Sequence, residues 1–342
     1  MKKILAKNEF YLFTILFVIC MTIGGMNSVF FSLGNMVDLL RTAIPYGIFA
    51  IGIMIVIVSG GIDISFPAIA TLSTYVTLLV FTNGNNEGNL LLFFLISCLI
   101  GMLLGLVNGF FIALFDFPPL IVTLATQSIY YGIQYTFFGS KRLTFLPEYI
   151  NAFSKAGLFT VVDENGMSYI FPVYFLILAF VLLLAFLVLR YTFAGRGIFA
   201  IGGSKSYAVR VGFNVKLLQF LVYGASGTIA ALGGAVYTIM IRQGNPASLI
   251  GLEMTIISIV VLGGIDINGG KGSIFGLILG LAFFTVINNS LILVGISSYW
   301  KTLVLGIAMY LYAAVIAYKG KIRDKQVHEI DGQDLQKKGR KC

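Results

Sequence analysis

The chain has 342 residues, of which 58% are hydrophobic and 11% are charged. A soluble protein carries about a quarter charged residues, so this composition cannot cover a water-facing surface of that size. The formal net charge is +9. Lys and Arg nevertheless flank apolar blocks or lie in the C-terminal tail, and no basic stripe carries interleaved aromatic residues, which argues against nucleic acid as a partner.

Side chains that could do chemistry are few. His328 is the only histidine and lies in the polar tail, which excludes a histidine triad or a histidine-rich metal site within this chain. Cys20 and Cys98 lie in apolar blocks and Cys342 is the last residue, so the cysteines form no disulfide framework or CxxC site. The sequence therefore predicts no catalytic residue, no metal site and no cofactor.

The apolar residues come in blocks of about 20, the length that crosses a hydrocarbon core of about 30 Å as a helix. They do not alternate with polar residues as the strands of a membrane barrel do. We therefore predict an all-α polytopic membrane protein with about ten transmembrane helices. In chain order the predicted spans are residues 10–27, 43–59, 66–82, 89–114, 120–139, 170–189, 217–241, 252–262, 273–294 and 299–318.

The segments between the spans differ in character. Residues 32–41 are predicted to form a short interfacial helix, residues 140–169 are the longest polar stretch, and residues 190–216 are basic and punctuated by glycine. Residues 1–318 form the predicted transmembrane domain, and residues 319–342 form a charged cytoplasmic tail. We assign both termini to the cytoplasm because this places 17 of the 23 Lys and Arg residues inside, as the positive-inside rule requires.

One short sequence occurs twice. Gly-Gly-Ile-Asp-Ile occupies residues 60–64 after the second span, and again residues 263–267 after the eighth. Paired glycine-interrupted segments often mark a transport path, and a carboxylate is expensive if it faces lipid. Asp63 and Asp266 are therefore candidates to line a wet cavity, to bind backbone amides or to form a subunit contact. Alternatively, each is simply the polar stop at the end of a span.

Residues 269–273 (Gly-Gly-Lys-Gly-Ser) invite comparison with a phosphate-binding loop. That motif needs a glycine six residues before the lysine, and Ser or Thr directly after it. Ile265 and Gly272 occupy those positions, so the segment does not match the motif. Any ATP hydrolysis that drives this protein must therefore occur on a separate chain.

Neutral polar residues lie inside several spans. Gln127, Tyr131 and Gln134 recur at helical spacing in the fifth span and share one face, with Tyr135 beside them. Neutral hydrogen-bonding groups and aromatic rings suit a polar solute such as a sugar, although polar residues also hold helices together. The residues predicted to line a translocation path are Asp63, Ser65, Gln127, Tyr131, Gln134, Asp266, Asn288 and Asn289.

Four segments carry a resemblance to a known family. In chain order they are residues 60–65 (Gly-Gly-Ile-Asp-Ile-Ser), 119–126 (Pro-Leu-Ile-Val-Thr-Leu-Ala-Thr), 195–203 (Gly-Arg-Gly-Ile-Phe-Ala-Ile-Gly-Gly) continuing to 212–215 (Gly-Phe-Asn-Val), and 260–264 (Val-Val-Leu-Gly-Gly) followed by 269–273. Together they resemble the permease subunits of ATP-binding-cassette (ABC) importers for ribose and other monosaccharides, the branched-chain amino acid/ribose type of inner-membrane translocator. Phe66 and Pro67 depart from that family, which usually has Val-Gly there.

The resemblance implies a multi-pass protein of the bacterial cytoplasmic membrane that translocates a monosaccharide or a similar small polar solute inward and is not itself an enzyme. It also implies partners: one or more cytoplasmic ABC ATPase subunits, an extracytoplasmic solute-binding protein, and a second permease subunit in a homodimer or heterodimer. The alternatives are a nucleoside, riboflavin or autoinducer substrate on the same architecture, or a secondary transporter. An intramembrane enzyme would need a Ser/His pair, paired aspartates or an HExxH helix in the spans, and none is present.

By analogy with the family, the connection 190–216 would dock on the ATPase, and the outer stretch 140–169 would contact the binding protein. A short, basic, amphipathic connection on the inner side could seat in a groove of a partner, although it could also be an ordinary positive-inside loop. The residues predicted to couple to the ATPase are Gly195, Arg196, Gly202, Gly203, Arg210, Gly212 and Asn214.

Overall fold

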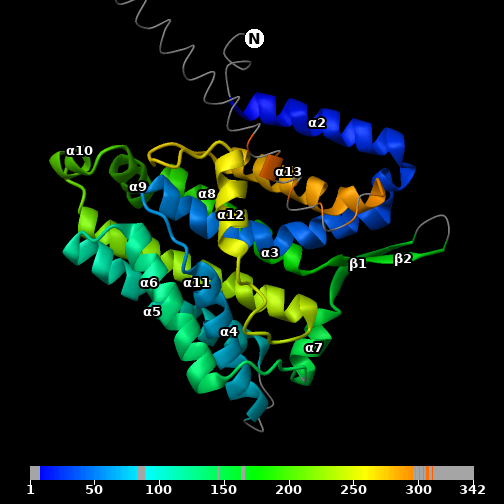
Figure 1. Ribbon diagram of the computed structural model, residues 1–342, viewed down its shortest axis with the longest axis horizontal. Helices are drawn as coiled ribbons and strands as arrows, with labels where there is room; N and C mark the ends of the chain where they lie inside the picture. Colours follow the sequence, from blue (N-terminus) through cyan, green and yellow to red (C-terminus); the bar gives the residue numbers. More distant parts are fainter. Residues whose placement is uncertain are drawn as a thin grey trace, which may run out of the picture.

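The computed structural model describes residues 8–83, 89–144, 146–162 and 166–295, together with positions 297, 300, 303, 306, 307 and 310. Over these residues the protein is mostly helical (Figure 1). The α-helices are α2 (Asn8–Met26), α3 (Leu33–Val58), α4 (Phe66–Asn83), α5 (Leu90–Phe115), α6 (Pro119–Ile133), α7 (Glu148–Ser154), α8 (Tyr174–Tyr191), α9 (Phe193–Gly203), α10 (Lys205–Arg210), α11 (Val215–Ile241), α12 (Leu252–Leu262) and α13 (Ile274–Leu293). A 3-10 helix η1 (Ser28–Phe31), a π-helical turn η2 (Gln134–Phe138) and the strands β1 (Gly157–Val162) and β2 (Ser168–Pro172) complete the described elements.

The first nine predicted spans each coincide with observed helical structure. Their ends agree to within about four residues, except that α3 begins ten residues before the second span and the fifth span is divided between α6 and η2. Within the described residues, six helices are long and apolar enough to cross a membrane, namely α2, α3, α5, α8, α11 and α13. Helix α12 has 11 residues and is therefore about 16 Å long, too short to cross a core of about 30 Å. The tenth predicted span and the charged tail lie outside the described residues, apart from the single positions given above.

The prediction of a separate interfacial helix over residues 32–41 is wrong. That segment is continuous with the second span in α3, and the Oγ of Ser32 caps the helix by accepting from the backbone N–H of Asn35 at 3.3 Å. The polar residues in this stretch suggested a break, but a long cationic side chain can reach polar surroundings from within a helix. Arg41 does this by donating to the carbonyl oxygen of Ile170 at 3.3 Å.

Helix α3 is the centre of the hydrophobic core. Every residue from Gly47 to Val58 is buried, as expected for a helix that is apolar all round and packed on all sides. It contacts α8, α11, α12 and α13, and it runs through the middle of the ribbon (Figure 1). The C-terminal end of α3 is therefore held inside the protein, and Gly60, the first residue of the Gly-Gly-Ile-Asp segment, is exposed just beyond it.

Helices α5 and α11 pack backbone against backbone. Three glycines of α5 lie four residues apart, a spacing that permits close helix packing. A Cβ added to Gly101 would lie 2.5 Å from the carbonyl oxygen of Gly227, and one added to Gly109 would lie 2.9 Å from that of Phe220. A Cβ on Gly105 would overlap the carbonyl oxygen of Tyr223. This rigid pair carries polar side chains of the site described below.

The substitution Gly105→Ala is expected to lower the stability of the purified protein in detergent by about 1–3 kcal/mol, because the added methyl group must push α5 and α11 apart. Gly132→Ala in α6 is the matched control, since a Cβ at that helical position meets nothing within 4 Å. Thermal unfolding of the two variants measures the difference. Equal melting temperatures would show that the α5–α11 contact is not as tight as described.

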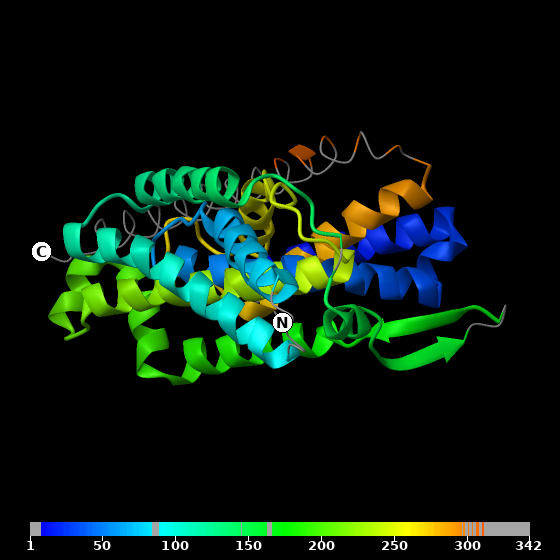
Figure 2. The ribbon, with the colours of Figure 1, turned by 90° about the horizontal axis from the view of Figure 1, so that it is seen from below.

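The sequence assigns the connections 140–169 and 190–216 to opposite sides of the membrane, and elements of the two lie at opposite ends of the molecule. Helices α9 and α10 occupy one end and the β1–β2 hairpin occupies the other in both views (Figures 1 and 2). The strands pair antiparallel, with Thr160 opposite Ile170 and Val162 opposite Ser168. The sequence contains a signal for this hairpin, the dipeptide Asn165-Gly166 between two runs of residues that favour β-strands.

Candidate functional site: a buried polar network and a glycine junction

Asp63 lies in an extended break between α3 and α4 and is fully buried. Its Oδ1 accepts hydrogen bonds from the backbone N–H of Ser65 at 2.9 Å and from the Oγ of Ser65 at 2.7 Å. Its Oδ2 accepts from the Oγ of Ser226 in α11 at 3.0 Å. A carboxylate at the start of a helix stabilises the unpaired N–H groups there. These contacts match the alternative in which Asp63 binds backbone amides.

The hydrogen bonds continue from Ser65 into two further helices. Asn108 of α5 donates from Nδ2 to the Oγ of Ser65 at 2.7 Å, and Thr126 of α6 donates from Oγ1 to the Oδ1 of Asn108 at 2.6 Å. The network therefore ties the break to α5, α6 and α11. Ser226 and Thr126 were missed in the sequence because Ser and Thr are ordinary in membrane helices, where they also bond to their own backbone.

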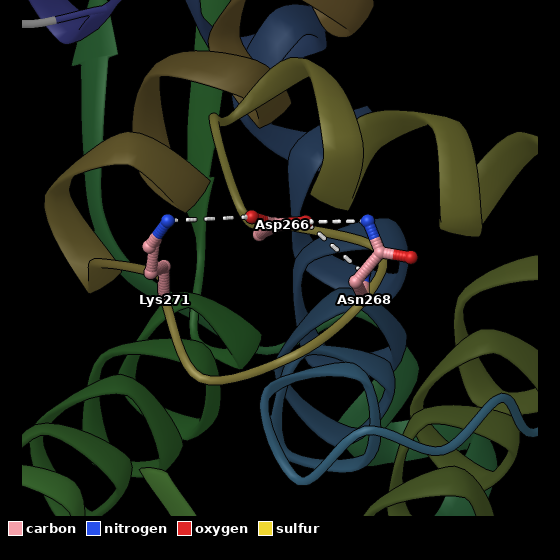
Figure 3. Close-up of polar contacts among 3 residues, drawn as sticks. All are labelled: Asp266, Asn268 and Lys271. Carbon is pink, nitrogen blue, oxygen red and sulfur yellow. Dashed lines mark hydrogen bonds and ion pairs between the residues drawn. The ribbon is translucent and has the colours of Figure 1, made fainter. Parts of the chain in front are cut away.

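Asp266, the counterpart of Asp63 in the second Gly-Gly-Ile-Asp segment, has a different environment. It is half-buried in the turn between α12 and α13, where its Oδ1 accepts from the N and Nδ2 of Asn268 at 3.1 and 3.2 Å (Figure 3). The Nζ of Lys271 lies 3.9 Å from its Oδ2. All of these partners belong to the same turn, so Asp266 fixes local loop shape and is not part of the Asp63 network.

Three turns meet beside the break, through four residues that we call the glycine junction: Gly60, Gly202, Gly269 and Gly270. The N–H of Gly270 donates to the carbonyl oxygen of Val58 at 2.9 Å. A Cβ on Gly269 would lie 2.8 Å from the Cα of Gly60 and 2.9 Å from that of Gly202. The junction thus joins the first Gly-Gly-Ile-Asp segment, and the turn after the second, to the end of α9. At Gly202, Gly269 and Gly270 the backbones are too close for a side chain.

The polar stripe predicted on the fifth span turns partly inward. Gln134 is fully buried at the first position of the π-helical turn, and its Oε1 accepts from the Oγ1 of Thr71 in α4 at 3.1 Å. Tyr131 is half-buried, and Tyr135 stacks on it with ring centroids 6.4 Å apart. Gln127 is half-buried one turn earlier. The structure therefore brings Tyr131 and Gln134 together on the side of α6 that faces α4.

Asn288 and Asn289 lie elsewhere, near the C-terminal end of α13. The Nδ2 of Asn289 donates to the Oγ1 of Thr42 at 2.9 Å and to the carbonyl oxygen of Asp38 at 3.2 Å, both in α3. Asn288 donates to the Oδ1 of Asn289 at 3.3 Å. These bonds are of the kind that hold helices together, and among the described residues none links this pair to Gln134 or Asp63.

The residues predicted to couple to an ATPase are divided between packing and exposure. Gly195 is buried where α9 passes the end of α8. The packing there is so close that a Cβ on Gly195 would overlap the carbonyl oxygens of Val188 and Leu189. Gly212 has a φ of +92°, and Asn214 caps α11 by accepting from the N–H of Leu217 at 3.1 Å. Three of the remaining members are exposed, namely Arg196, Gly203 and Arg210.

Long apolar helices, glycine-mediated helix contacts and a polar network at a broken helix characterise an all-α, polytopic membrane protein. In the described part of the chain no three His, Cys, Asp or Glu side chains gather as metal ligands would. The chain belongs to the family described as branched-chain amino acid transport system / permease component, which matches residues 35–313. It is accordingly a transporter permease component, a class that is not enzymatic by itself.

Curated relatives cover nearly the whole chain. The chain is 31% identical to the galactose/methyl galactoside import permease protein of Salmonella typhimurium over 309 residues, 86% of this chain and 90% of the relative. It is 31% identical to the ribose import permease protein of Bacillus subtilis, over 86% of this chain and 88% of the relative. An autoinducer 2 import system permease protein of Photorhabdus luminescens is 29% identical, over 86% of this chain and 84% of the relative. No solved structure gave a significant match.

Proposed function

We propose that this chain is the membrane-spanning permease of an ABC importer that carries a monosaccharide or a similar small polar solute inward across the cytoplasmic membrane of a bacterium. The observation that carries the proposal is the likeness, over 86% of the chain, to import permeases for galactose and for ribose. Import works by alternating access, in which the helices reorient around a central path without chemistry on the solute. A second permease subunit, identical or related, completes the transporter.

The energy for import comes from a separate ATPase, since the chain carries no phosphate-binding loop. The α9–α10 end is suited to dock it. Helix α10 and the residue after it expose Tyr207, Val209 and Val211. A group of exposed apolar side chains at a water-facing end is a mark of a surface that a partner covers. The glycine junction then offers a direct route from the docked end of α9 to the break that holds Asp63.

At the other end, the β1–β2 hairpin and α7 form the surface proposed for the solute-binding protein. The path between the two ends is assigned to the polar residues predicted in the sequence, with Tyr131 and Gln134 at its centre. Asp63 and Ser65 hold the break beside it, and Asn288 and Asn289 hold α13 to α3. Asp266 contributes through the shape of its turn.

The substitution Val209→Asp is expected to weaken retention of the ATPase by about tenfold or more, the effect of removing a central contact from a protein interface. Val162→Asp in β1 is the matched control, because Val162 is 63% exposed and Val209 is 61% exposed. It should leave ATPase retention unchanged and instead weaken stimulation by the binding protein. Co-purification with the tagged permease and ATPase rate against binding-protein concentration measure the two effects. The docking assignments are wrong if the two substitutions act alike.

Reconstituted vesicles containing the permease, its ATPase and its binding protein test the transport assignment. ATP-dependent uptake of ribose, galactose or fructose is the expected result. Autoinducer 2 belongs in the same panel, because one relative is an import permease for it. Uptake that proceeds without the ATPase would contradict the proposal and indicate a secondary transporter.

A further inference from the structure

Three buried polar atoms near the C-terminal end of α6 and the N-terminal end of α12 have no hydrogen-bond partner. They are the Nε2 of Gln134, the hydroxyl of Tyr131 and the Oε2 of Glu253. Leaving a buried polar group unpaired costs about 1–3 kcal/mol, and the great majority of buried polar groups in proteins are paired. Two of these atoms lie on one face of a single helical turn, and buried groups left without partners indicate a site for a ligand that supplies the missing bonds.

Glu253 lies near Tyr131 although the two are distant in the sequence. Tyr131 and Gln134 lie one helical turn apart and share a face of α6. Because Thr71 donates to the Oε1 of Gln134, the amide is oriented with its Nε2 donor free. The carboxylate of Glu253, in the first turn of α12, is close enough to act electrostatically on Tyr131. Helix α4, which carries Thr71, contacts both α6 and α12.

The surrounding backbone has features of a built site. Gln134 begins a π-helical turn, an irregularity that is often found where helices carry functional residues. The segments that follow α6 and α11 are joined over this end, since Leu143 and Gly244 exchange two backbone hydrogen bonds of 2.8 and 2.9 Å. The hydroxyl of Tyr75 also donates to the carbonyl oxygen of Lys141 at 2.8 Å.

We propose that Glu253, Tyr131 and Gln134 form a contact site for the hydroxyl groups of a polyhydroxylated solute during its passage through the protein. This inference rests on the proposed import function and adds a residue that the sequence motifs did not include. A carboxylate accepts from a hydroxyl, whereas an amide and a phenol donate to one, so the set matches a pair of neighbouring hydroxyls. The stacked rings of Tyr131 and Tyr135 provide an apolar surface for the carbon skeleton.

Glu253 is also unusual by sequence. It is the only charged residue in the predicted span 252–262, and an ionisable side chain within a membrane segment is a candidate for function by default. Its position in the first turn of α12 satisfies the preference of that helix end for negative charge. A purely structural role in capping is therefore the competing explanation, and the experiment must separate it from solute contact.

The test compares solutes that differ by one hydroxyl. Vesicles with the complete transporter take up D-ribose, D-galactose and their monodeoxy analogues, with the binding protein saturated so that rate differences arise in the membrane. The wild-type protein is expected to transport one analogue roughly tenfold more slowly than its parent sugar, the value of one hydrogen bond to a charged group. In Glu253→Ala this ratio should fall to about one.

Tyr131→Phe removes only a hydroxyl and should also reduce the ratio, so it carries the test if Glu253→Ala does not reach the membrane. Ser258→Ala is the control on α12, because among the described residues the Oγ of Ser258 bonds only within its own helix, to the carbonyl oxygen of Met254. If Glu253→Ala and Tyr131→Phe slowed the uptake of the parent sugar and of its analogues equally, the inference would be overturned and Glu253 would be assigned to helix capping. The absence of ATP-dependent uptake of every solute in the panel, autoinducer 2 included, by the wild-type protein would instead overturn the import function and the inference with it.

Discussion

Gly202→Ala is expected to reduce ATP-driven uptake by about 5- to 150-fold. The added methyl group would overlap the carbonyl oxygen of Val58 and the N–H of Gly270, so the three turns of the glycine junction must separate. Overpacking of this kind costs about 1–3 kcal/mol, which corresponds to that range in a coupling equilibrium. Because the junction is the contact between the end of α9 and the break at Asp63, the loss should appear as uncoupled ATP hydrolysis.

Gly203→Ala is the control for this experiment. Gly203 is the next residue along the chain, it is exposed, and a Cβ there meets nothing within 4 Å. The measurements are uptake and ATPase activity of both variants in vesicles, normalised to the amount of folded permease. Wild-type uptake by Gly202→Ala would exclude the junction as a route of coupling. Equal loss in both variants would indicate that the end of α9 acts through the ATPase surface instead.

Asp63→Ala is expected to destabilise the protein by about 3–5 kcal/mol, the usual effect of removing one partner from a buried charged network. The substitution leaves the N–H and Oγ of Ser65 and the Oγ of Ser226 without their acceptor. It also frees the start of α4 from α11. Thermal unfolding in detergent should show a fall of roughly 10 °C, since 1 kcal/mol corresponds to about 2–4 °C in a domain of 150–250 residues.

Asp266→Ala is the matched comparison, because the two aspartates stand in the same Gly-Gly-Ile-Asp-Ile sequence. Asp266 is half-buried, and its ion-pair partner Lys271 is exposed, so the pair is worth about 0–1 kcal/mol. A shift of no more than a few degrees is therefore expected. Similar destabilisation by both substitutions would mean that the two segments have equivalent roles, contrary to the contacts described.

Composition and hydrophobic pattern determined that this chain is an all-α membrane protein, and they located the first nine predicted helices. Helix formation is a local requirement in a bilayer, because each span must satisfy its own backbone hydrogen bonds wherever the others lie. The four family-like segments likewise pointed to an import permease, and the family match over residues 35–313 agrees with them. The same local reasoning failed at residues 32–41, where polar side chains lie within one continuous helix.

Only the tertiary structure distinguished the two aspartates. The five residues Gly-Gly-Ile-Asp-Ile are the same in both, but Asp63 is surrounded by donors from α11 and from its own break. Among the described residues, Asp266 has side-chain partners only in its own turn. The glycine junction and the approach of Glu253 to Tyr131 were likewise not predicted from the sequence. Their members are up to 210 residues apart in numbering, from Gly60 to Gly270, and no local periodicity records which distant backbones touch. Packing of whole helices decides that, and the packing depends on all of their contacts at once.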